Sequence, residues 1–157
     1  MLFRSIINIK KHPDAEKLYI EEIDLGNEKR QIVSGLVPYY SAEELLNKKI
    51  VVVTNLEPAK LRGVESNGML LAAQNGNGVD AIVDLLSPNG EIGDYIFLEG
   101  MNQEDIDTTK NLQKINIKEF SEYKLEVKDK SAYCNGILLK TVAGNVTTEK
   151  VSDGVVR

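Results

Sequence analysis

The sequence predicts a mainly β protein built on an OB-fold, a five-stranded Greek-key barrel with one short helix. Short apolar runs rich in β-branched residues recur between turn residues, which is typical of strands. The main helix signal is brief and falls between the third and fourth expected strands. The two most distinctive polar loops lie between strands 1 and 2 and between strands 4 and 5, where an OB-fold places its ligand groove.

The first three strands precede the helix. Residues Leu2–Ile9 supply the first, and a turn at His12–Ala15 follows, where proline fixes φ and aspartate bonds the backbone two residues on. Residues Lys17–Ser34 are typical of a hairpin. Its apolar residues change from even to odd positions after Glu21–Glu22. Such a change of phase predicts a β-bulge in the second strand.

The helix and the last two barrel strands follow. Ser41 and Glu44 have the spacing of a capping box, with serine at the N-cap and glutamate at the third helical position. The runs Ile50–Val53 and Met69–Ala73 are continuously apolar, which indicates strands buried on both faces. Between them lies the polar loop Asn55–Asn67. A polar loop between two core strands is a usual place for a binding site.

Beyond the barrel, the acidic connector Met101–Thr108 marks the expected domain boundary. It separates an OB-fold domain at residues 1–101 from a small α+β extension packed on it at residues 102–157. Within the extension, residues 109–119 are weakly helical. Five further short strands are expected on the two sides of the connector: Ala81–Leu86, Tyr95–Leu98, Tyr123–Val127, Ser131–Asn135 and Ile137–Val142.

The composition sets limits on function. With 157 residues, of which 42% are hydrophobic, the chain can bury one sizeable core. The formal net charge of −5 argues against a generic polyanion binder. The charges are unevenly placed, because residues 74–109 hold eight acidic and no basic residues, whereas residues 110–157 hold nine basic and six acidic ones. A nucleic acid would therefore have to meet a local basic surface with few cations.

Several classes of protein are disfavoured. No apolar run approaches the roughly 20 residues of a membrane-spanning helix, and no signal peptide is recognisable. The single cysteine, Cys134, excludes an internal disulfide and is expected to be buried. The only histidine, His12, has no partner for catalysis or metal binding and is expected to cap its turn. We therefore expect a cytoplasmic protein with no metal, no cofactor and no catalytic residue.

Three motifs carry a resemblance to a known family. They are KHPDAEKLYIEEIDLG, RQIVSGLV and NLEPAKLRGVESNGML, and they occur in this order in the first half of the chain. They resemble the tRNA-binding domain of several aminoacyl-tRNA synthetases and free-standing tRNA-binding proteins. The resemblance is strongest to the endothelial-monocyte-activating polypeptide II type, which has an extra C-terminal segment. It implies an OB-fold, tRNA as the partner and an appended, non-catalytic role.

The candidate site residues come from the loop Asn55–Asn67 and its edges. Lys60 and Arg62 stand two apart, so in an extended segment both would project to one side and straddle phosphates. The resemblance implies that these two residues and Ser66 contact tRNA. Six further candidates complete the expected surface: Asn55 and Met69 at the edges of the loop, and the cations Lys10, Lys11, Lys17 and Arg30 on strands 1–3.

A structural alternative stays open for most of these residues. Asn55 and Pro58 would then only shape the turn, Lys60 and Arg62 would be solvated, and Met69 would belong to the core. Each of the four flanking cations is, taken singly, more often a solvated surface charge.

The expected function is a non-catalytic tRNA-binding module that grips the tRNA backbone with little sequence specificity. It would assist aminoacylation as an appended domain of a methionyl, tyrosyl or lysyl synthetase. No nucleophile–base pair, metal cluster or phosphate loop supports an enzyme. The alternative is a protein-interaction or cytokine-like module released from a synthetase or synthetase complex, with other synthetases as partners. In the family, the extension covers the surface through which shorter relatives dimerise, so we expect a monomer.

Overall fold

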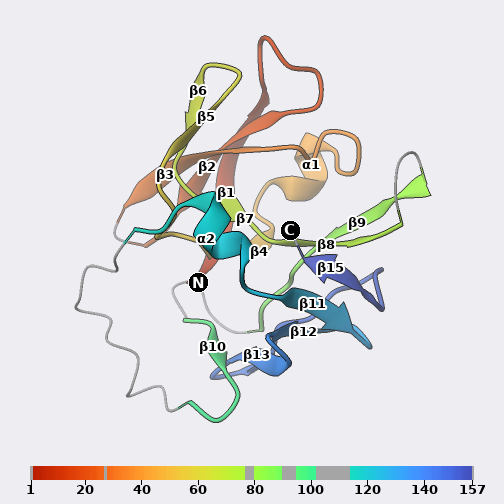
Figure 1. Cartoon of the computed structure of the whole chain (residues 1–157). Helices are drawn as coiled ribbons and strands as arrows, with labels where there is room; N and C mark the ends of the chain where they lie inside the picture. The colour runs from red at the N-terminus through yellow and green to blue at the C-terminus, as the bar shows by residue number, and fades with distance from the viewer. Residues whose placement is uncertain (1, 27, 77–79, 90–94, 102–113, 157) are drawn as a thin grey trace.

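The structure is a computed structural model of the chain. It describes residues 2–26, 28–76, 80–89, 95–101 and 114–156. These residues form two antiparallel sheets, one separate hairpin and two short helices, which confirms the mainly β fold class (Figure 1).

The first sheet is an OB-like barrel with the strand order β3-β2-β1-β4-β7. Its strands are β1 (Leu2–Lys11), β2 (Tyr19–Asp24), β3 (Lys29–Ser34), β4 (Lys49–Val53) and β7 (Met69–Leu70). Among the described residues, no continuous ladder joins the edge strands β3 and β7. Two single hydrogen bonds approach across this gap instead. The Asn67 backbone N–H donates to the Gln31 carbonyl at 2.8 Å, and the Val33 N–H donates to Ser66 Oγ at 3.0 Å.

The bulge expected in the second strand lies in its partner. Strand β2 pairs with β3 in unbroken register, whereas the register of β1 against β2 shifts between Ile6 and Asn8. The sequence misled because Ile20 lines a hollow on the outer face of the sheet, while Tyr19 and Ile23 pack in the barrel interior. An apolar residue on the outer face looks like a change of phase, although the strand alternates regularly.

The short helix α1 (Ala42–Leu45) begins where the sequence predicted. Ser41 Oγ accepts from the Glu44 N–H at 3.2 Å, and Glu44 Oε1 accepts from the Ser41 N–H at 3.1 Å, which completes the capping box. Leu45 is fully buried in the barrel core. The helix thus covers part of the barrel with one apolar side chain and leaves its acidic residues in solvent.

The second sheet has the order β10-β13-β12-β11-β15-β8-β9, with β14 paired to β13. Its strands are β8 (Ala72–Asn75), β9 (Ile82–Leu85), β10 (Phe97–Leu98), β11 (Leu125–Lys128), β12 (Ser131–Cys134), β13 (Ile137–Thr141), β14 (Gly144–Asn145) and β15 (Gly154–Val156). Strand β15 pairs antiparallel with β8, so the C-terminal segment extends a sheet that begins in the N-terminal part (Figure 1). The C-terminal extension is therefore packed on the barrel, as predicted.

Two hydrophobic cores share the central strands. Alternate residues of the runs around β4, β7 and β8 face opposite sides, which confirms that these runs are buried on both faces. The barrel core receives Ile50, Val52, Leu70 and Ala72, and the second core receives Val51, Val53, Leu71 and Ala73. From the C-terminal segment, the second core receives Leu125, Val127, Ala132, Leu139 and Val151, among others. One set of strands thus supports both halves of the molecule.

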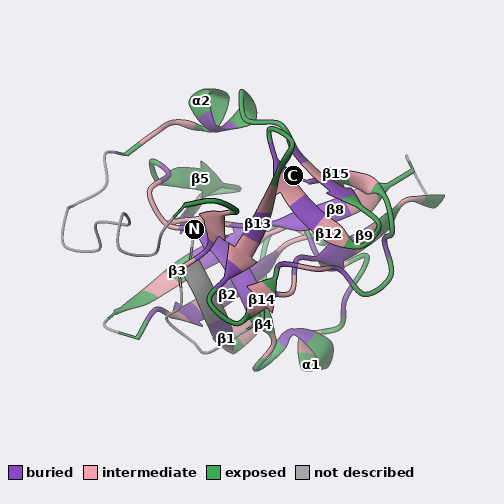
Figure 2. Ribbon diagram, turned by 90° about the horizontal axis from the view of Figure 1, so that it is seen from below, coloured by how far each residue is buried: buried purple, intermediate pink, exposed green. Residues whose placement is uncertain are grey.

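Only part of the expected helix at residues 109–119 is helical. Helix α2 spans Ile117–Ser121, and Asn116 caps it by accepting from the Glu119 N–H at 2.9 Å. Ile115 instead forms a parallel bridge with Leu56, because the preceding chain is extended. Residues 109–113 and the boundary expected within 101–108 lie outside the described residues, apart from Met101. Figure 2 shows both helices at the periphery, with mostly exposed residues, and burial concentrated in the strands.

The junction between the barrel and the C-terminal segment contains a buried carboxylate. Asp84, at the end of β9, is 1% exposed. Its Oδ2 accepts hydrogen bonds from the three backbone N–H groups of residues 149–151, and its Oδ1 accepts from the Tyr40 hydroxyl at 3.2 Å. The same hydroxyl accepts from the Leu85 N–H at 3.0 Å, and burial raises the pKa of Tyr40 to about 12. Asp84 therefore joins β9, the segment before α1 and the C-terminal segment in one network.

Candidate functional site

The loop expected between the barrel strands is itself a β-hairpin. Strands β5 (Ala59–Leu61) and β6 (Val64–Ser66) pair antiparallel. Arg62 and Gly63 form the two-residue turn, with φ values of 51° and 83°. Positive φ at both central residues is the feature of a type I′ hairpin turn. All three residues of β5 are exposed, so the hairpin projects from the barrel (Figure 1).

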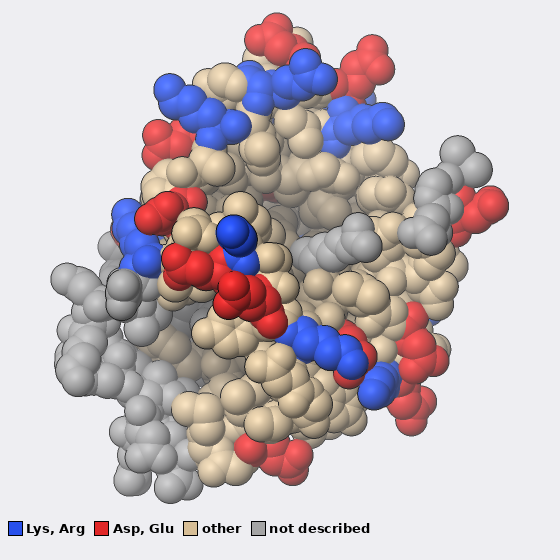
Figure 3. Space-filling view, in the orientation of Figure 1, with Lys and Arg blue, Asp and Glu red and all other residues tan. Residues whose placement is uncertain are grey.

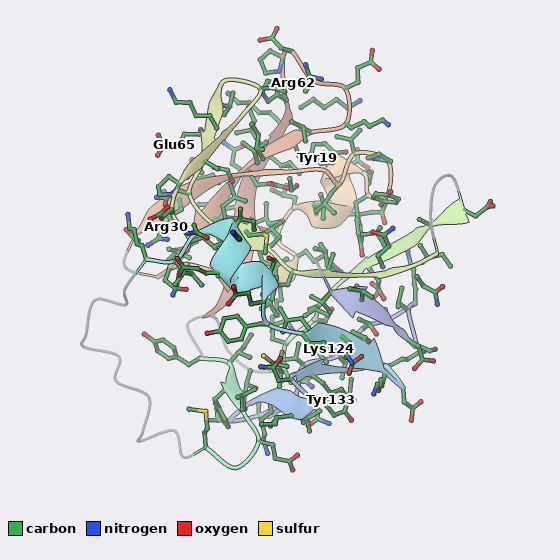
Figure 4. The ribbon with its side chains drawn as sticks, viewed as in Figure 1. Tyr19, Arg30, Arg62, Glu65, Lys124 and Tyr133 are labelled. Carbon is green, nitrogen blue, oxygen red and sulfur yellow. The ribbon has the colours of Figure 1, made fainter. Side chains whose placement is uncertain are left out.

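Lys60 and Arg62 do not occupy equivalent positions of one extended strand, as the two-residue spacing had predicted. Lys60 lies on β5 opposite Glu65, whereas Arg62 lies in the turn at the tip of the hairpin (Figure 4). Both side chains are exposed, and neither forms an ion pair within the described part of the chain. The two cations therefore remain available to a ligand, Arg62 at the tip and Lys60 on the flank.

Ser66 lies at the base of this hairpin and is 6% exposed. Its Oγ accepts from the Val33 N–H at 3.0 Å and donates to the Gly68 carbonyl at 3.1 Å. The hydroxyl hydrogen is thus used inside the protein, where the sequence had predicted a donor to phosphate or ribose. As placed here, Ser66 fixes the hairpin base against β3 and does not present its hydroxyl to solvent.

Met69 and Asn55 lie at the two edges of the hairpin segment and are half-buried. Met69 packs against the second core, in line with its structural alternative. The Asn55 carbonyl accepts from the Ile115 N–H at 2.9 Å, and the Glu57 N–H donates to the Ile115 carbonyl at 2.8 Å. The C-terminal segment therefore holds the root of the hairpin, a contact that the sequence did not indicate.

The four flanking cations divide into two groups. Arg30 is half-buried, and its guanidinium donates to the Thr54 carbonyl and to Glu28 Oε1. It therefore ties β3 to the end of β4. The lysines Lys10, Lys11 and Lys17 are exposed. Lys10 also lines a hollow of about 320 Å³ on the outer face of β1, β2 and β3, which carries acidic as well as basic side chains.

The loop between β1 and β2 lies beside the hairpin tip. His12 is buried, and its Nδ1 accepts from the Asp14 N–H at 3.0 Å, which confirms the turn-capping role predicted for it. Its Nε2 lies 3.2 Å from the Leu61 carbonyl oxygen, at the end of β5. The two loops that line the OB-fold groove are therefore in direct contact. The sequence gave no signal for this contact, because the two residues are 49 positions apart.

Figure 3 shows Lys and Arg side chains gathered at the end of the molecule where the hairpin tip projects, with acidic side chains at the rim. The exposed cations of the hairpin and of the neighbouring loop are Lys11, Lys17, Lys60 and Arg62. This is a small basic surface on an acidic chain. Within the described ranges, no group of three or more His, Cys, Asp or Glu side chains is placed to hold a metal ion.

Cys134 is buried, as predicted, and burial raises the pKa of its thiol. Of the helices in the described part of the chain, none combines the length and the apolar character needed to cross a membrane.

A β-barrel of the OB type that presents unpaired cations on its 1–2 loop and its projecting hairpin is a nucleic-acid-binding module in architecture. A family model described as a putative tRNA binding domain matches residues 2–94, which is more than half of the chain. The chain therefore belongs to this family of tRNA-binding domains.

Similar proteins extend the match beyond the barrel. The methionine–tRNA ligase of Borrelia garinii subsp. bavariensis is 38% identical over 96% of this chain, and the cytoplasmic tyrosine–tRNA ligase of Xenopus tropicalis is 36% identical over 95%. This chain spans only 21% and 29% of those two ligases. The solved C-terminal domain of Plasmodium vivax p43 superposes with a TM-score of 0.82, at 28% identity, over 99% of this chain and 94% of that domain. The predicted resemblance, including the C-terminal segment, is thus confirmed.

Proposed function

We propose that this chain is a non-catalytic module that grips the tRNA backbone through hairpin β5–β6 and the loop between β1 and β2. The observation that carries the proposal is the exposure of Lys60 and Arg62, which are unpaired within the described residues, on a projecting hairpin of a tRNA-binding-domain fold. The module would assist aminoacylation as an appended part of a synthetase. The ligase relatives, which match this chain over only part of their length, support that context.

The geometry favours recognition of backbone and shape over recognition of sequence. The Arg62 guanidinium, held at a turn, can bind a phosphate with two parallel hydrogen bonds, while Lys60 adds a point charge. Lys11 and Lys17 on the neighbouring loop can meet adjacent phosphates. With so few cations, about two to four counterions should be released on binding, so the salt dependence should be shallow. A weak site of this kind is useful when a tether raises the local concentration of tRNA.

The test is fluorescence anisotropy of labelled bulk tRNA over a salt series, with the wild type and the double variant Lys60→Ala/Arg62→Ala. The matched control is Lys124→Ala/Lys128→Ala, which removes two exposed lysines from the C-terminal part. We expect micromolar binding by the wild type and the control, and a loss of tenfold or more in the hairpin variant. The hairpin variant should also release about two fewer counterions.

A folded wild type that does not bind tRNA at low salt would overturn the proposed function. That outcome would favour the alternative, a protein-interaction module of a synthetase complex.

We further propose that the chain is monomeric and cytoplasmic and that its partners beyond tRNA are synthetase domains. The pairing of β15 with β8 supports a monomer, because it covers the outer side of the barrel strands with residues of the same chain. Light scattering after size-exclusion chromatography should give the mass of one chain, and a stable dimer would contradict this. The proposed domains, 1–101 and 102–157, should unfold together because they share one core.

A further inference from the structure

His12 makes two directed hydrogen bonds from one buried ring. It is 5% exposed, its Nδ1 lies 3.0 Å from the Asp14 backbone nitrogen, and its Nε2 lies 3.2 Å from the Leu61 carbonyl oxygen. Because the Asp14 N–H donates, Nδ1 must carry a lone pair, and the ring hydrogen of the neutral imidazole then resides on Nε2. His12 Nε2–H therefore donates to the Leu61 carbonyl, and both nitrogens are used.

This second bond reaches the hairpin at a particular place. Leu61 is the last residue of β5 and lies between Lys60 and Arg62. The hairpin base is held by β3, since Gln31 Nε2 donates to the Glu65 carbonyl at 2.8 Å. Within the described residues, the bond from His12 is the only hydrogen bond that joins residues 60–64 to an element outside the hairpin.

A two-stranded hairpin by itself is at best marginally stable in water. If its tip were untied, Lys60 and Arg62 would sample many positions, and ordering them would reduce the affinity for a ligand. The loop that holds His12 also carries Lys11 on one side of it and Lys17 on the other. The same bond therefore sets the separation between the cations of the loop and those of the hairpin.

We propose that His12 is a positioning residue for tRNA binding, which ties the hairpin tip to the loop between β1 and β2 so that their cations form one surface. This inference rests on the proposed function of the hairpin. His12 is not expected to contact tRNA itself, because its ring is buried and both nitrogens are occupied.

Two substitutions separate the bonds. His12→Asn keeps an acceptor for the Asp14 N–H in an Asx-type turn but is too short to reach Leu61. His12→Gln places an amide N–H near the former Nε2 position and can still donate to the Leu61 carbonyl. Urea unfolding of both variants controls for a general loss of structure. We expect His12→Asn to weaken tRNA binding by threefold to tenfold, and His12→Gln to retain most of the affinity.

The path of the effect is tested by combining variants. In the Lys60→Ala/Arg62→Ala background, His12→Asn should cause no further loss of tRNA affinity, because the cations that it positions are already absent. A further loss as large as in the wild-type background would show that His12 acts elsewhere and would overturn the proposal.

A second measurement needs no RNA. Trypsin cleaves after arginine and lysine, and a tied hairpin resists cleavage, because cleavage follows the population of open forms. His12→Asn should speed cleavage after Arg62 severalfold, while His12→Gln should remain close to the wild type. Equal cleavage of the wild type and His12→Asn overturns the positioning role whatever the tRNA result. A folded wild type that binds no tRNA, but whose Asn variant is cleaved faster, overturns the proposed function and with it the role of His12 in tRNA binding.

Discussion

The C-terminal segment and the hairpin β5–β6 are attached to the same barrel in opposite ways. The C-terminal segment shares a sheet and a hydrophobic core with it, and Asp84 at the junction is fully satisfied by buried donors. The hairpin contributes an exposed strand and is held by a few hydrogen bonds to its base, root and tip. Substitutions at the junction should therefore change the free energy of unfolding, whereas substitutions on the hairpin should change binding.

The largest effect is expected from Asp84→Ala. The substitution leaves the three backbone N–H groups of residues 149–151 and the Tyr40 hydroxyl without their acceptor. Each buried orphan costs about 1–3 kcal/mol, so the free energy of unfolding should fall by roughly 4 kcal/mol in urea titration. Asp153→Ala, at an exposed carboxylate of the same segment, should lose less than about 1 kcal/mol. Similar losses in the two variants would contradict the special role of the junction.

Glu21 sharpens the comparison, because it is buried but poorly satisfied. It is fully buried, its Oε1 accepts from the Ser34 hydroxyl, and its Oε2 has no partner among the described residues. Burial raises the pKa of Glu21 from its ordinary value of 4.5 to about 8, against the opposing effect of the Ser34 bond. The raised pKa means that the folded protein holds the neutral acid.

Stability should therefore be undiminished below about pH 4.5 and fall as the pH rises to about 8. The slope is on the order of 1.4 kcal/mol per pH unit. Glu21→Gln mimics the neutral acid, so it should be more stable than the wild type at pH 8, by on the order of 3 kcal/mol, and nearly equal to it at pH 4.5. Urea unfolding across this pH range checks the sign, and a constant difference would refute the neutral form.

Two glycines provide a matched pair on the two regions. A Cβ added at Gly154 would lie 2.5 Å from the Gln74 carbonyl oxygen, so β15 could not keep its place beside β8. Gly154→Ala should lower the free energy of unfolding by about 2 kcal/mol. Gly63 has no neighbour within 4 Å of an added Cβ, and only its φ of +83° opposes substitution. Gly63→Ala should cost about 1 kcal/mol, and a greater loss than in Gly154→Ala would reverse the comparison.

The smallest effect on stability is expected from Lys60→Ala/Arg62→Ala. Both side chains are exposed and make no ion pair within the described residues, so the free energy of unfolding should change by less than about 0.5 kcal/mol. Since the same variant should lose tRNA binding, it separates affinity from folding. A thermal midpoint well below that of the wild type would mean that the hairpin cations also support the fold.

Local signals in the sequence predicted most of the fold. The Ser41–Glu44 capping box and the doubly buried run Ile50–Val53 depend on neighbours within a few positions, and both are confirmed. The hairpin inside Asn55–Asn67 was missed, because a type I′ turn usually begins with Asn, Asp or Gly, and here Arg62 takes that place. Strand β15 was missed as well, because three residues are too few to show a period.

The candidate site was predictable in its location but not in its construction. The positions of Lys60 and Arg62 follow from the loop and the family resemblance, and their role in tRNA binding stays a prediction. The roles of Ser66, Ile115 and His12 depend on partners that lie far away in the sequence or on another strand. No periodicity records such contacts, so only the folded arrangement distinguishes a residue that meets a ligand from one that holds the loop in place.

The pairing of β15 with β8 also has a consequence for the order in which the protein can mature on the ribosome. Strand β8 ends at Asn75 and its partner begins at Gly154, so about eighty residues separate them. At roughly 5–20 residues per second, several seconds pass between the synthesis of the two strands. During that interval the outward side chains of Val51, Val53 and Leu71 lack the core that later covers them. A nascent barrel of this kind is exposed to association through that face, and synthesis of the final strand ends the exposure.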